Sequence, residues 1–175
     1  MQQKELTLLI NDCKKQNHKA QVVVYDLFFK AMYNTAFRIV QDQHLVEDIM
    51  QEAFITAFSK IDTLKEAITF PKWLKQIVVR KSLTHIKKVR KFSALDVEQL
   101  EIETDDIVIE VEGFGVQRII TAINSLKDNY RILLTLHYIE GYDYEELVEI
   151  TGFTYINCRT IISRAKESLR KKLAS

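Results

Sequence analysis

The chain has 175 residues, of which 47% are hydrophobic, and its formal net charge is +1. This composition supports a packed core and excludes a wholly disordered protein. No apolar run approaches the roughly 20 residues that a membrane-spanning helix needs, and the N-terminus lacks a signal-peptide pattern. Cys13 and Cys158 stand apart in the sequence, which argues against a disulfide framework or a zinc site and favours a reducing, cytoplasmic setting.

The first half of the chain predicts helices over about residues 3–15, 18–40, 43–60 and 70–91, because apolar residues recur there at helical spacing. The scarcity of glycine (four) and proline (one) agrees with a helical chain. In the second helix, the residues predicted to face the core are Val23, Leu27, Ala31, Tyr33, Ala36 and Val40.

The third predicted helix carries an acidic face. Glu47, Asp48, Gln51 and Glu52 share one side of it, since residues three and four apart are neighbours on a helix. This face could offer hydrogen-bond acceptors to a basic partner, or it could be an ordinary solvated surface. A metal site built on His44, Glu47 and Asp48 would need further ligands that no second cluster supplies, so neither a metal nor a cofactor is expected.

The fourth predicted helix is strongly basic, with eight Lys or Arg residues and no acid from Lys72 to Lys91. Such a helix suits a nucleic-acid backbone, and Phe70 or Trp73 at its start could stack on an unpaired base, although Trp73 also fits the core. A solvated face or an anionic membrane surface is the alternative. The candidate DNA-binding residues are Lys72, Lys75, Arg80, Lys81, Lys87 and Lys88.

An acidic segment follows, with eight acids and no base from Ser93 to Glu112 and no clean helical stripe. Helical spacing resumes over about residues 114–125, 128–139, 143–151 and 155–173. The sequence therefore predicts an all-α protein in which helical domains at 1–91 and 113–175 are joined by an acidic linker at 92–112.

The last two predicted helices have the form of a helix-turn-helix. Asp143 and Thr154 are suitable N-caps, and Gly152 permits the left-handed turn between the helices. The second helix could enter a DNA major groove, where Arg pairs with guanine and Asn with adenine. A plain helical hairpin with a solvated basic face is the alternative. The candidate DNA-reading residues are Tyr155, Asn157, Arg159, Thr160, Ser163 and Arg164.

Three motifs stand in a particular order: "EDIMQEAF" at Glu47–Phe54, "FPKWLKQI" at Phe70–Ile77, and "EGYDYEEL" followed by "TG" and "SRAKESLR". In this order and spacing, the chain resembles the extracytoplasmic-function group of bacterial sigma factors, the promoter-specificity subunits of RNA polymerase. The likeness covers nearly the whole chain. It departs from the usual family pattern at Arg80, Thr84, Tyr155, Ile156 and Ile161, among other positions, and Ile161 could pack on a thymine methyl group or be covered by an inhibitor.

The resemblance implies a non-catalytic protein whose partners are core RNA polymerase and promoter DNA. The acidic face would contact the clamp helices of the largest polymerase subunit. The loop at 62–69 and the basic helix would capture and melt the minus-ten element, and the helix-turn-helix would read the minus-thirty-five element. The resemblance also allows for an anti-sigma partner. The rival hypothesis is a sigma-like protein–protein module that sequesters a partner without productive promoter binding.

Overall fold

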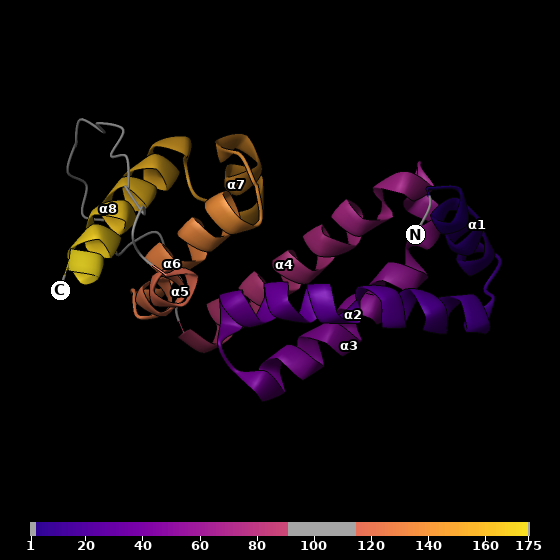
Figure 1. Cartoon of the computed structure of the whole chain (residues 1–175). Coiled ribbons are helices and arrows are strands. Elements are labelled where there is room, and N and C mark those ends of the chain that lie inside the picture. Colours follow the sequence, from indigo (N-terminus) through magenta and orange to yellow (C-terminus); the bar gives the residue numbers. More distant parts are fainter. Residues whose placement is uncertain (1–2, 91–114, 175) are drawn as a thin grey trace. The chain divides into compact units, whose positions relative to one another are not determined.

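The computed structural model describes residues 3–90 and 115–174, and within these ranges every regular element is a helix. This confirms the predicted all-α fold class (Figure 1). Contacts divide the chain into two compact units, Met1–Ile86 and Lys87–Ser175. The predicted acidic linker at 92–112 lies outside the described residues. In the part of the chain that is described, no helix combines the length and the apolarity needed to span a bilayer.

The first unit contains α1 (Gln3–Lys14), α2 (His18–Val40), α3 (Gln43–Ser59) and most of α4 (Phe70–Arg90), which continues past the end of this unit at Ile86 (Figure 1). Two short 3₁₀ helices, Ile61–Thr63 and Ala67–Thr69, connect α3 to α4. Side-chain caps set two of the helix starts: Asn17 accepts a hydrogen bond from the Lys19 backbone N–H at the start of α2, and Asp42 accepts one from Leu45 at the start of α3. These boundaries match the predicted helices closely.

The buried side of α2 was only partly predicted. Ala36 and Val40 lie in the core as expected, but Val23 and Leu27 are 46% and 48% exposed. Val24, next to Val23, is fully buried instead. The N-terminal half of α2 carries apolar residues around most of its circumference, so the periodicity could not show which side packs against α1 and α3.

The second unit contains α5 (Val116–Asn124), α6 (Asp128–Leu134), α7 (Tyr144–Thr151) and α8 (Tyr155–Ala174). A π-helical turn, Thr135–Ile139, continues α6. The helix α8 packs against α5, α6 and α7, so its buried arc is wide. Cys158 lies fully inside this core, as predicted from its apolar periodic position.

The turn between α7 and α8 has the predicted helix-turn-helix chemistry. At the start of α7, Asp143 and Glu146 form a capping box: the Glu146 N–H donates to Asp143 at 2.8 Å, and the Asp143 N–H donates to Glu146 at 3.1 Å. Gly152 ends the helix at φ 77°, and the Asn157 N–H donates to the Thr154 hydroxyl at 3.2 Å. The caps therefore fix where α7 ends and α8 begins.

Replacing Gly152 with alanine is expected to destabilise the second unit by about 1–2 kcal/mol, the cost of a left-handed backbone for an L-residue. A Cβ at Gly152 would meet nothing within 4 Å, so the cost is conformational rather than steric. Gly115→Ala is the matched control, because Gly115 has φ −63° and equal space. Hydrogen exchange of the α7 and α8 amides should accelerate in Gly152→Ala alone. Equal acceleration in both variants would contradict this explanation.

Candidate nucleic-acid and partner-binding surfaces

The acidic face of α3 is formed as predicted, with every member exposed. Its members are Glu47, Asp48, Gln51 and Glu52. The opposite side of the helix is buried through Ile49 and Ala53. Sequence reasoning missed Ile55, which lies four residues after Gln51 on this face and is 68% exposed. The sequence does contain a signal for Ile55, because an isoleucine at that spacing interrupts an otherwise polar side of the helix.

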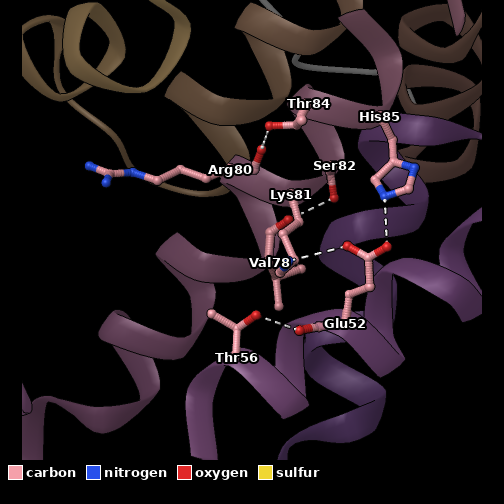
Figure 2. A network of polar contacts seen from close by, with 8 residues as sticks. All are labelled: Glu52, Thr56, Val78, Arg80, Lys81, Ser82, Thr84 and His85. Atoms are coloured by element: carbon pink, nitrogen blue, oxygen red, sulfur yellow. Dashed lines mark hydrogen bonds and ion pairs between the residues drawn. The ribbon is translucent and has the colours of Figure 1, made fainter. Parts of the chain in front are cut away.

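Glu52 forms an ion pair with a lysine of the basic helix α4 (Figure 2). Its carboxylate lies 3.2 Å from the Lys81 ammonium and 3.6 Å from His85 Nε2. The hydrogen bond from Lys81 is the main reason that the pKa of the Glu52 carboxyl is lowered, and His85 adds a smaller effect. The sequence alone predicts Glu52 and Lys81 on two different candidate surfaces. The structure joins them, so Lys81 also holds α4 against α3.

This ion pair predicts a pH-dependent contribution to stability. Since the pKa of Glu52 is lowered in the folded state, the pair stabilises the protein above the unfolded pKa, and the effect is lost as pH falls through the folded value. Lys81→Met should therefore lower the free energy of unfolding at pH 7 by at most about 1 kcal/mol, the upper end for an exposed pair.

Urea unfolding followed by Trp73 fluorescence measures this difference in the first unit. Near pH 3, Lys81→Met and the wild type should unfold at more similar urea concentrations. Lys30→Met, a change at an exposed lysine of α2, controls for the loss of one charge. A loss of stability in Lys81→Met that is the same at both pH values would assign the effect to the packing of the lysine stem instead.

The predicted minus-ten residues of α4 do not all face the same way. Lys72, Arg80, Lys87 and Lys88 are exposed, whereas Lys75 and Lys81 are half-buried. Figure 2 shows the Arg80 side chain extending away from the cluster of Glu52, Lys81 and His85. Arg80 and Lys88 are eight residues apart and lie toward the same side of the helix, whereas the Lys87 ammonium donates a hydrogen bond to the Thr151 carbonyl oxygen at 2.9 Å. An outward basic strip therefore remains on α4 beside the ion-paired Lys81.

Phe70 cannot stack on a base as suggested by the sequence, because it is fully buried. Its ring packs between Phe28 and Trp73, with centroid distances of 5.4 and 5.9 Å. It opens α4 directly after a short 3₁₀ helix, where the chain must be anchored to the core. Trp73 is half-buried, so part of its ring reaches the surface.

On α8, the structure leaves most of the predicted DNA-reading residues at the surface. Tyr155 is 43% exposed, and the half-buried ones are Asn157, Arg159, Ser163 and Arg164. Thr160 is only 7% exposed, so the prediction that it lies on the outer surface is wrong. Ile161 is 1% exposed and belongs to the core of its own unit, which removes it as a contact for a thymine or an inhibitor. Both errors follow from the three helices that pack around α8.

A row of aromatic rings supports the start of α8. The ring of Tyr155 lies 5.5 Å from that of Tyr144, which lies 4.8 Å from the imidazole of His137. His137 Nδ1 is 2.7 Å from the Tyr142 carbonyl oxygen. His137 lies in the π-helical turn, Tyr142 in the loop after it, Tyr144 on α7 and Tyr155 on α8. Ile156, which sequence reasoning did not include among the site residues, follows Tyr155 and is 74% exposed.

Comparison with known proteins matches both units. The family description "Sigma-70 region 2" matches residues 24–92, and "Sigma-70, region 4" matches residues 116–169. Among solved structures, the sigma factor RpoE from Bartonella quintana, in complex with the anti-sigma factor NepR, has the same fold with a TM-score of 0.56. That comparison covers 86% of this chain and 94% of RpoE at 22% identity.

Two relatives from Bacillus subtilis agree with this assignment over most of their length. The ECF RNA polymerase sigma factor SigW is 29% identical over 176 residues, covering 94% of each chain. The ECF RNA polymerase sigma factor SigM is 24% identical over 149 residues, covering 84% of this chain and 91% of SigM. With two sigma-70 regions in sequence order and relatives along nearly the whole chain, this protein belongs to the extracytoplasmic-function group of the sigma-70 family.

Proposed function

We propose that separate helices of this alternative sigma factor, which directs RNA polymerase to promoters, bind separate partners. The acidic face of α3 binds core polymerase, with Ile55 as an apolar contact at its end. The outward basic strip of α4 and the loop at 62–69 capture and melt the minus-ten element, within a domain at 1–91. The helix α8 reads the minus-thirty-five element within a domain at 113–175. The chain acts in the cytoplasm through binding free energy, without catalytic chemistry or a cofactor.

The observation that carries this proposal is the separation of charge on exposed surfaces. The acidic face of α3 is exposed, and Arg80 of α4 extends away from Glu52 (Figure 2). Lys88 of α4 is exposed as well, and α8 supplies a second cationic helix. A DNA phosphate backbone attracts cations and a basic partner attracts carboxylates, so one chain can hold both without competition. The acidic linker, with eight acids from Ser93 to Glu112, would then pass along a cationic part of the polymerase.

An anti-sigma factor is a further partner that we propose, because RpoE from Bartonella quintana was solved bound to one. This protein class would compete with polymerase or DNA for the surfaces described above. A sigma-like module that only sequesters a partner is the alternative function, and the exposed Ile156 and Tyr155 favour it more than any other feature.

Gel filtration with purified core polymerase, followed by DNA binding measured at several salt concentrations, tests the proposal. We expect a stable complex at moderate salt. Binding of that complex to promoter DNA should weaken steeply as salt rises, because each phosphate contact releases a counterion. A protein that binds no core polymerase would overturn the proposal. A complex whose DNA binding is independent of salt would favour the sequestering module.

A further inference from the structure

Ile156 is in an unusual position for an isoleucine. Among the described residues, no large hydrophobic side chain is more exposed than this one, at 74%. It is the second residue of α8, the helix proposed to enter the major groove, and it belongs to the end of that helix which contacts base edges in helix-turn-helix proteins. A β-branched apolar side chain at this point gives no hydrogen bond to a base and no charge to a phosphate.

The backbone that carries Ile156 is held in place from two sides. The Thr154 hydroxyl accepts the Asn157 N–H at 3.2 Å, which fixes the first turn of α8. Tyr155 packs against Tyr144, and Tyr144 against His137, which anchors the start of the helix to the rest of the unit. In a helix, isoleucine strongly prefers one χ1 rotamer. Ile156 is therefore a rigid apolar contact at a defined place.

The surroundings of Ile156 indicate its ligand. Arg159 and Lys166 lie further along the same helix, and six Lys or Arg residues face one acid from Tyr155 to Lys172. An anionic partner fits this surface, and in the major groove of DNA the apolar group that a base presents is the C5-methyl group of thymine. We propose that Ile156 packs against the C5-methyl group of one thymine in the minus-thirty-five element and so determines specificity at that base pair. This inference rests on the proposed function.

Deoxyuridine differs from thymidine only in lacking this methyl group, so replacing one thymidine with deoxyuridine tests the contact directly. Promoter duplexes with single deoxyuridine substitutions in the minus-thirty-five element are bound by holoenzyme reconstituted from core polymerase and this chain. We expect one position at which deoxyuridine weakens wild-type binding by roughly fourfold, the effect of burying one methyl group. Holoenzyme with Ile156→Ala should bind the thymine and deoxyuridine duplexes equally.

Val116→Ala is the matched control, because Val116 is a β-branched residue with nearly the same exposure, 73%, at the start of α5. This variant should keep the wild-type preference for thymine. The proposal is wrong if deoxyuridine has no effect on the wild type at any position, or if Ile156→Ala keeps the thymine preference. It is also wrong if Ile156→Ala weakens only the binding of core polymerase or of a protein inhibitor. A wild-type holoenzyme that fails to prefer promoter over unrelated DNA would instead refute the proposed function.

Discussion

Replacing Asp48 with lysine is expected to weaken the binding of core RNA polymerase by about tenfold to a hundredfold, and transcription should fall with it. Asp48 lies in the middle of the exposed acidic face of α3. A lysine there would bring its positive charge against the basic surface of the polymerase that this face is proposed to bind. The expected loss corresponds to roughly 1.4–2.8 kcal/mol. Since the side chain is exposed, the fold should tolerate the change, which circular dichroism can confirm. Titration of labelled core polymerase measures the affinity.

Asp26→Lys provides the control for this experiment. Asp26 is an exposed acid of α2 in the same unit, and its replacement changes the net charge by the same amount. If long-range attraction alone held the complex together, both variants would lose affinity equally, and that result would refute a docking role for the acidic face. Ile55→Ala asks whether the apolar end of the same face contributes, as the apolar centre of a protein interface does.

Replacing Arg159 with alanine is expected to remove discrimination at one base pair of the minus-thirty-five element. A bidentate contact from arginine to guanine contributes about 1–3 kcal/mol of discrimination against the wrong base. Affinity for the preferred promoter should therefore fall by about fivefold to 150-fold, while promoters altered at that base pair lose little. A binding assay over a set of single-base-pair variants, with reconstituted holoenzyme, gives both quantities.

Arg170→Ala separates base reading from phosphate contact. Arg170 is exposed near the other end of α8, where a contact to the DNA backbone is expected. Its loss should weaken binding to all sequences alike and lower the slope against salt by about one. If Arg159→Ala behaved in the same way as Arg170→Ala, Arg159 would be a phosphate contact and its assignment as a base-reading residue would be wrong.

Much of the fold could be predicted from local sequence signals. The capping box at Asp143, the left-handed Gly152 and the cap at Thr154 each act within four residues, so the sequence contains everything needed to recognise them. The bounds of the helices followed from apolar spacing for the same reason. The exposure of the acidic face on α3 also followed, because Val46, Ile49, Met50 and Ala53 leave one side of that helix for solvent.

What could not be predicted depends on contacts between helices. The exposure of Val23 and Leu27 depends on which side of α2 meets its neighbours, and apolar residues around that helix hide the answer. Thr160 and Ile161 are covered because three helices pack around α8. The Glu52–Lys81 pair joins residues 29 positions apart, so no local pattern contains it. The contacts of Thr160, Ile161 and Lys81 between helices, and not the helix bounds, account for the differences between the predicted and the observed candidate site.

We propose that this chain brings RNA polymerase to promoters by using two separate cationic helices. Sequencing the transcripts that reconstituted holoenzyme makes on genomic DNA tests it most directly. We expect start sites preceded by two shared elements at a constant spacing, with Arg80→Ala weakening use of the downstream element and Arg159→Ala that of the upstream one. Start sites with no shared element, or two variants with identical defects, would contradict the claim.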